Sequence, residues 1–254
     1  LTLLCIFPKV DIYFEASNDI FKLTSKSIKF RKKIEKYIPI EINYFRNIYK
    51  INSRSFDYFK KFKNISSKHI SFIDSNIDNL DVALREGKIT EKLKLIYYKK
   101  MHYLLNNIKS IFKKDIIICL HPKNSDKKIF KIFKKHKIVK YQTPKIIKNS
   151  YMVLFHDSSA ALDAILLKKN LLCINSKILG NYWNDRINQY ANKLNLPVIN
   201  LDTEYKLEKK KLLKKFFYSK KKYSTYQKNN LQIDGNKIGE NKVIEILKKN
   251  IENY

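Results

Sequence analysis

The strongest constraint on the fold is an alternation of short apolar strands with helices that begins near residue 69. The expected strands cover 70–74, 116–120, 138–141, 151–155, 171–175 and 198–201, and the expected helices between them include 91–112 and 127–136. The strand 116–120 is an apolar, β-branched run, which is typical of a strand that is buried on both faces. Strands that alternate with helices form a doubly wound parallel sheet. We therefore predict an α/β, Rossmann-like fold.

The chain of 254 residues is expected to hold three segments. Residues 1–64 contain short strand-like and helical runs, at 2–7, 11–14, 27–37 and 38–44, and we interpret them as the end of a truncated N-terminal α/β domain. Residues 65–202 form the Rossmann-like domain, after a polar, turn-prone boundary. Residues 203–254 are lysine-rich, with helices to about 226 and over 239–250, and are expected to pack back across the domains. Because the sequence begins at Leu1, we expect a fragment or a processed chain.

The formal net charge of +30 raises the question of an anionic partner. Only five of the 53 basic residues are arginine, whereas bidentate recognition of phosphates and bases favours arginine. The excess of lysine accompanies an excess of isoleucine, asparagine, tyrosine and phenylalanine, which is the pattern of an AT-rich coding sequence. We expect no specific nucleic-acid partner. The lysine run 209–222 is interpreted as a solvated helix face, with peripheral contact to an anionic membrane as the alternative.

The length of the apolar runs and the spacing of the cysteines indicate the cellular compartment of the protein. The longest apolar runs are far shorter than the roughly 18 residues of a membrane span, and the first seven residues are too short for a signal peptide. Cys5, Cys119 and Cys173 each lie in an apolar run, without the spacing of a disulfide framework or a zinc site. We predict a cytoplasmic protein, peripheral at the inner membrane face in the alternative just given.

Polar residues follow two of the expected strands at the point where each strand ends. His121 and Pro122 follow the strand 116–120, and His156-Asp157-Ser158-Ser159 follow the strand 151–155 and precede an apolar helix. Ligands of open parallel sheets bind outside the carboxyl ends of the strands. Backbone N–H groups at a helix start, with hydroxyl groups beside them, favour a phosphate. The sequence therefore predicts a site for a phosphate-bearing donor.

The main candidates are His121 and the serine pair. We expect His121 to stabilise the donor phosphate as charge develops on the leaving nucleotide, or to serve as general acid; the alternative is a strand cap that binds its own loop. Ser158 and Ser159 are expected to contact phosphate or nucleotide, with plain helix capping as the alternative. Pro122 and Lys123 complete the predicted donor-binding set.

Three further residues are secondary candidates. Asp74 ends the strand 70–74 and faces the expected cleft, where it is a candidate for donor contact. His156 and Asp157 lie on the same turn as the serines; the alternatives are that His156 covers the sheet edge and that Asp157 is a local turn or cap acid. The sequence carries neither an Asp-x-Asp arrangement nor another metal-ligand set, so we predict no metal and no cofactor.

With these elements placed, the chain resembles the C-terminal part of GT-B-type glycosyltransferases of bacterial surface polysaccharides, of the sialyltransferase, polysialyltransferase or CDP-glycerol glycerophosphotransferase type. The matching strings are IICLHP at 117–122, VLFHDSSAALDAIL at 153–166, LLCI at 171–174 and YSTY at 223–226. The resemblance implies that His121, Ser158 and Ser159 hold the phosphate and nucleotide of a CMP- or UDP-linked sugar. It also implies a glycan or lipid-linked acceptor.

The resemblance implies a general base as well, in an Asp/Glu-Asp/Glu-Gly motif of the N-terminal domain. The nearest string here, Arg85-Glu86-Gly87, lacks the first acid, so the base is absent from this chain or not recognisable. We predict a metal-independent glycosyltransferase of capsule or lipopolysaccharide biosynthesis. The alternatives are a CDP-glycerol-type glycerophosphotransferase, a non-hydrolysing UDP-sugar epimerase, a non-catalytic nucleotide-binding fragment and a polyanion-binding protein.

Overall fold

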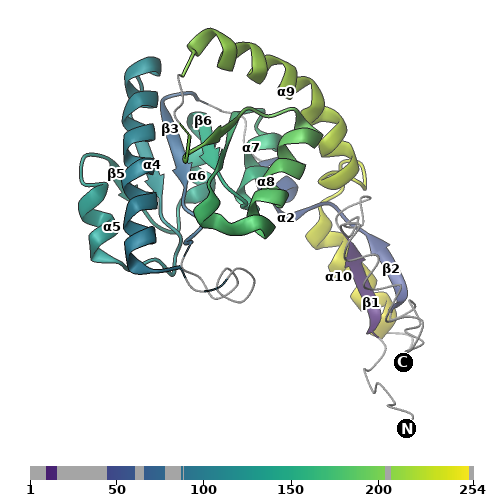
Figure 1. The fold of residues 1–254 in the computed structure, drawn as a ribbon. Helices are drawn as coiled ribbons and strands as arrows, with labels where there is room; N and C mark the ends of the chain where they lie inside the picture. Colours follow the sequence, from purple (N-terminus) through teal and green to yellow (C-terminus); the bar gives the residue numbers. More distant parts are fainter. Residues whose placement is uncertain are drawn as a thin grey trace, which may run out of the picture. The chain divides into compact units, whose positions relative to one another are not determined.

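The computed structural model describes residues 10–15, 45–60, 66–77, 87, 89–203 and 207–251 (Figure 1). The chain divides into two compact units: a terminal unit, Leu1–Lys60 with Gln227–Tyr254, and a sheet unit, Lys61–Tyr226. The predicted C-terminal segment, 203–254, is therefore divided. Its residues up to Tyr226 belong to the sheet unit, and the rest belong to the terminal unit with residues 1–60. The elements expected at 2–7, 27–37 and 38–44 lie outside the described residues, as does Cys5.

The terminal unit contains a two-stranded parallel sheet and two helices. β1 (Val10–Glu15) confirms the strand expected at 11–14 and pairs with β2 (Phe45–Lys50), which the sequence did not predict. In α2 (Arg54–Lys60) the carboxylate of Asp57 accepts hydrogen bonds from the backbone N–H groups of Gly239 and Glu240, at 3.0 and 3.2 Å. These two residues begin α10 (Gly239–Ile251), so Asp57 joins the two helices.

The sheet unit is built on six parallel strands in the order β5-β4-β3-β6-β7-β8. The strands are β3 (His69–Ile73), β4 (Ile116–Cys119), β5 (Lys137–Val139), β6 (Ser150–Phe155), β7 (Asn170–Asn175) and β8 (Val198–Asn200). All six lie within two residues of the predicted strands. The predicted α/β, Rossmann-like fold is confirmed.

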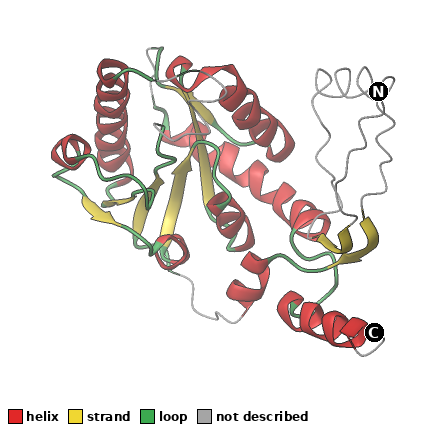
Figure 2. Ribbon diagram, turned by 90° about the horizontal axis from the view of Figure 1, so that it is seen from below, coloured by secondary structure: helices red, strands yellow, loops and turns green. Residues whose placement is uncertain are grey.

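Helices cover both faces of this sheet (Figure 2). Those of the sheet unit are α4 (Glu91–Phe112), α5 (Lys127–Ile132), α6 (Thr143–Lys148), α7 (Ala160–Leu166) and α8 (Gly180–Leu194), followed by α9 (Lys209–Asn230), which crosses into the terminal unit. The chain runs outward from β3 through α4 and α5, returns through α6, and runs outward from β6 through α7 and α8. Because such crossovers are right-handed, the two runs place their helices on opposite faces.

The strand order therefore reverses between β3 and β6, which are neighbours at the centre of the sheet. The chain leaves β3 towards one edge and leaves β6 towards the other. At such a switch point the connections after the two strands diverge and leave a crevice outside their carboxyl ends, where ligands of this fold bind. The topology thus specifies one preferred location for a site.

The core follows from the apolar strands and the long helix α4. Phe72, Ile118 and Leu154 in the central strands are fully buried, as are Met101 and Leu104 of α4. Cys119 and Cys173 are buried and form no disulfide, as the sequence predicted. None of the helices in the described part carries an apolar stretch of the length that a bilayer requires.

One helix prediction was wrong in detail, because the helix expected at 127–136 ends at Ile132. The helix α8 was not predicted from the sequence. This helix begins at Gly180 and is rich in asparagine and tyrosine, which have modest helix propensity. Its helical signal is the buried stripe at positions 187, 191 and 194.

Candidate functional site

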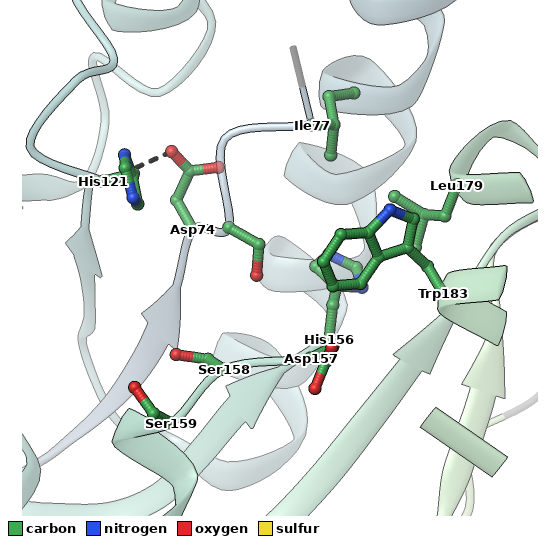
Figure 3. A pocket seen from close by; sticks show the side chains of 10 residues that line it. Asp74, Ile77, His121, His156, Asp157, Ser158, Ser159, Leu179 and Trp183 are labelled. Carbon is green, nitrogen blue, oxygen red and sulfur yellow. Dashed lines mark hydrogen bonds between the residues drawn. The ribbon is translucent and has the colours of Figure 1, made fainter. Parts of the chain in front are cut away.

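A pocket of about 250 Å³ opens at the carboxyl ends of β3 and β6, at the switch point (Figure 3). We call it the switch-point pocket, and its lining residues are Asp74, Ser75, Ile77, His121, His156, Asp157, Ser158, Ser159, Leu179 and Trp183. Six of the eight predicted site residues belong to this set. The other two, Pro122 and Lys123, are exposed and are not part of the lining.

The carboxylate of Asp74 holds the β3 side of the pocket together. It accepts hydrogen bonds from the hydroxyl of Tyr98 in α4 (3.0 Å) and from the side chain of Asn124 (2.9 Å). It also accepts from the backbone N–H groups of Asn76 and His121, at 3.2 and 3.3 Å. With four donors and only 3% of its surface exposed, Asp74 acts as a positioning residue for the loop that carries His121.

His121 is half-buried at the wall of the pocket. Its backbone N–H is bound to Asp74, and its Nδ1 accepts a hydrogen bond from the backbone N–H of Lys123 at 3.2 Å. Since Nδ1 is the acceptor, the neutral ring carries its proton on Nε2. No described residue accepts a hydrogen bond from Nε2. His121 therefore offers one uncommitted N–H donor at the site.

The two serines differ in what they do locally. Ser158 Oγ accepts a hydrogen bond from the backbone N–H of Ala160 at 3.3 Å, so this hydroxyl supports the turn into α7. Ser159 occupies the cap position of α7, but its side chain caps nothing and is exposed. Ser158 thus has part of the capping role that was the alternative to ligand contact. The Ser159 hydroxyl has no such role and is available to a ligand. In Figure 3 both side chains lie below His121, and Trp183 and Leu179 lie across the pocket from all three.

His156 forms a buried part of the lining, and both of its ring nitrogens are engaged. Nδ1 lies 2.8 Å from the carbonyl oxygen of Ile174, which can only accept, so Nδ1 carries the proton. Nε2 then accepts from the hydroxyl of Tyr97. Burial lowers the pKa of His156 to about 4, against the opposing effects of the Ile174 carbonyl and Asp74. The side chain is neutral and structural, and it offers no polar atom to a ligand.

Asp157 is neutralised by an arginine. Its carboxylate lies 2.5 Å from Nε of Arg186 in α8, and the guanidinium stacks over the rings of Tyr182 and Trp183, each at 5.7 Å. Burial raises the pKa of the Asp157 carboxyl although Arg186 opposes that rise. Asp157 therefore anchors α8 to the end of β6.

The lining residues Leu179 and Trp183 belong to the connection and helix that sequence analysis missed. Trp183 is the chain's only tryptophan, and Arg186 beside it is one of five arginines among 53 basic residues. Such rare residue types in a strongly biased composition were the one available signal. The Nε1–H of Trp183 is buried and has no acceptor among the described residues, so it is a second uncommitted donor.

The hydrogen-bond acceptors of the pocket are therefore occupied by donors of the protein itself, whereas several of its donors have no partner. Asp74 and Asp157 are both fully engaged by protein donors, whereas His121 Nε2, Ser159 Oγ and Trp183 Nε1 are uncommitted. Phosphate oxygens are strong acceptors that match such a set. Among the described residues, there is no group of three or more His, Cys, Asp or Glu side chains that could hold a metal ion.

No protein-family model matches the chain, and no curated protein sequence matches it. Among the solved structures that are similar to the chain is UDP-GlcNAc 2-epimerase of Methanocaldococcus jannaschii in complex with UDP-GlcNAc and UDP, at 18% identity and a TM-score of 0.47, over 88% of this chain and 58% of that one. Another is the β-Kdo 2,7 transferase KpsC of Thermosulfurimonas dismutans, at 14% identity and a TM-score of 0.35, over 78% of this chain and 54% of that one. A further one is S. aureus MnaA with UDP, at 13% identity and a TM-score of 0.39, over 76% of this chain and 54% of that one.

This chain spans 54–58% of the length of those proteins. With identities below 20% and TM-scores below 0.5, the similarities do not assign a function to it.

We predict that Asp74→Asn destabilises the sheet unit. An amide supplies one acceptor oxygen where the carboxylate supplies two, and its NH₂ group faces donors. We expect the free energy of unfolding in urea to fall by about 2–4 kcal/mol. The matched control is Asp185→Asn at an exposed position of α8, which should change it by less than about 0.5 kcal/mol. Equal stability of the two variants would contradict the role given to Asp74.

We also predict a pH dependence that originates at His156. The unfolded chain binds a proton near the ordinary pKa of 6.5, whereas the folded protein binds it only near 4, so stability is lost as the pH falls through this window. Between pH 7 and 5 the contribution lost is about 2 kcal/mol. Urea denaturation of wild type and His156→Gln should show the smaller pH dependence in the variant. Identical pH dependence would show that His156 is not buried in its neutral form.

Proposed function

We propose that this chain is the donor-binding part of a GT-B-like glycosyltransferase of surface-polysaccharide assembly, and that the switch-point pocket holds the phosphate of a nucleotide-activated sugar. The observation that carries the proposal is the set of uncommitted donors at the point where the strand order reverses. The resemblance of 117–122 and 153–166 to such enzymes supports it, because those two strings supply His121, Ser158 and Ser159.

In this proposal His121 Nε2–H and the Ser159 hydroxyl both donate to phosphate oxygens in the pocket. Donors placed where negative charge develops lower the barrier, because the leaving nucleotide gains charge in the transition state. His121 is the candidate catalytic residue. The Trp183 indole N–H would bind a further oxygen of the donor.

The volume of about 250 Å³ is small for a whole nucleotide-sugar, since pockets for drug-sized ligands span roughly 300–1,000 Å³. We infer that the pocket holds the phosphates and part of the nucleotide. The rest of the donor would extend beyond it.

The transfer we propose is a direct displacement. An acceptor hydroxyl oxygen forms a bond to the anomeric carbon, the bond from that carbon to the phosphate oxygen breaks, and its electron pair leaves with the nucleotide. The hydroxyl proton goes to a base. Asp74 and Asp157 are both engaged within the protein, so this base lies outside the pocket. In the same proposal the step uses no metal and no cofactor, and the acceptor is a glycan or a lipid-linked glycan.

The engaged carboxylates also favour a second candidate, a nucleotide-binding module without chemistry of its own. The CDP-glycerol alternative differs only in the leaving group. A CDP-polyol leaves CMP, whereas a UDP-sugar leaves UDP. These possibilities share the pocket and are separated by which nucleotide binds and by whether transfer follows.

The test is a thermal-shift titration of the whole chain with CMP, CDP, UDP and GDP. A nucleotide at a hundredfold excess over its dissociation constant stabilises the folded protein by about 2.7 kcal/mol, which is a shift of several degrees. We expect one nucleotide to be selected. The selected base distinguishes a UDP-linked donor from a CMP- or CDP-linked one.

His121→Ala and Ser159→Ala should abolish the shift and leave the melting temperature without nucleotide nearly unchanged, because neither side chain is buried. Ser224→Ala, at an exposed serine of α9, is the matched control and should keep the shift. No shift with any nucleotide, or the same shift in all three variants, would overturn the proposed donor site.

A further inference from the structure

The helix α9 has two faces of different chemistry. Leu212, Phe216, Ser219 and Tyr223 recur at helical spacing and are at most 9% exposed, so they form its core-facing stripe. Ser219 Oγ also donates to the carbonyl oxygen of Asn195 at 2.6 Å. These contacts fix the rotation of this part of α9 in the sheet unit, and therefore decide which side chains point outward.

Six outward side chains share a helical spacing. Counted from position 210, the others follow after three, four, seven, eight and eleven residues, at 213, 214, 217, 218 and 221. This spacing places them on one face, the α9 outer face, whose members are Lys210, Leu213, Lys214, Phe217, Tyr218 and Lys221. The face spans about 16 Å of helix. Three of its members are apolar or aromatic, and the other three are cationic.

The apolar members are unusually exposed. Leu213, Phe217 and Tyr218 are 40%, 60% and 45% exposed, although single exposed apolar residues need no explanation. Here they adjoin one another, and the rings of Phe217 and Tyr218 meet edge to face at 5.6 Å. The ammonium group of Lys221 lies over both rings, at 4.6 and 5.5 Å. An apolar strip bordered by lysines is thus directed away from the core.

The charge of this segment is of one sign. Residues 209–222 contain eight lysines and no acidic residue, and no aspartate or glutamate occurs up to Asn230. The apolar stem of a lysine side chain can lie in apolar surroundings while its ammonium group stays at a charged surface. The complementary partner is therefore anionic and also accepts apolar groups.

We propose that the α9 outer face docks on an anionic lipid bilayer, with Leu213, Phe217 and Tyr218 inserted at the boundary of headgroups and acyl chains. A helix with lysines flanking leucine and phenylalanine lies in the plane of such an interface. Nucleic acid would satisfy the lysines and offer stacking to the rings, but it gives Leu213 no apolar surroundings. This surface is separate from the switch-point pocket and does not depend on the proposed function.

The experiment is co-sedimentation of the whole chain with vesicles of phosphatidylcholine, alone or mixed with phosphatidylserine, at several salt concentrations. We expect binding to the mixed vesicles, weaker binding to pure phosphatidylcholine, and a decline with salt. Lys210→Ser and Lys214→Ser should each weaken binding about fivefold. The double variant Leu213→Ser/Phe217→Ser should weaken it by at least about tenfold at the same net charge.

The matched control is Tyr103→Ser, which removes an equally exposed aromatic ring (64% exposed) from α4 and should bind as wild type does. Circular dichroism checks that each variant keeps its helices. Absence of binding to anionic vesicles would overturn the proposal. Equal binding by the double variant and wild type would also overturn it, because bulk charge alone would then explain the attraction. Tighter binding to single-stranded RNA, lost in the double variant, would assign the face to nucleic acid instead.

Discussion

The hydrogen-bonded carboxylate of Asp74 is the interaction on which the candidate site depends. It joins the end of β3 to the Tyr98 hydroxyl of α4 and to Asn124 and the His121 backbone in the loop after β4. On the same helix, Tyr97 binds His156 at the end of β6. Three strand ends are thus joined to one helix by hydrogen bonds, and all of these except the bond from the His121 backbone are fully buried.

This arrangement also decides the chemistry of the pocket. Buried carboxylates need donors, and Asp74 and Asp157 obtain them from the protein. The groups left without a protein partner are donors, on His121, Ser159 and Trp183. A site of this kind suits an anionic ligand with several acceptor oxygens. It does not suit proton abstraction, which is why the proposed transfer takes its base from elsewhere.

Much of the fold and part of the site were predictable from the sequence. The apolar strands and their order specify a parallel sheet, and parallel strands bring His121 and the Ser158–Ser159 pair to one edge. The partners of Asp74 were not predictable, because Tyr98 and Asn124 lie 24 and 50 residues away in the chain. Trp183 was missed because α8 has weak helix-forming residues and few apolar ones.

The most direct test of the account is hydrogen exchange of the chain, followed by mass spectrometry, with and without the nucleotide that stabilises it. If the nucleotide binds at the switch point, exchange should slow in the two segments that border the switch-point pocket, 121–124 and 157–162. A second cavity, of about 310 Å³, lies at the opposite edge of the sheet, and its lining residues are Lys68, His69, Lys109, Asp115, Ile116, Ile117, Lys135 and Lys137. Protection confined to the residues around that cavity would contradict the account, because nucleotide would then bind to lysine charge and not at the switch point.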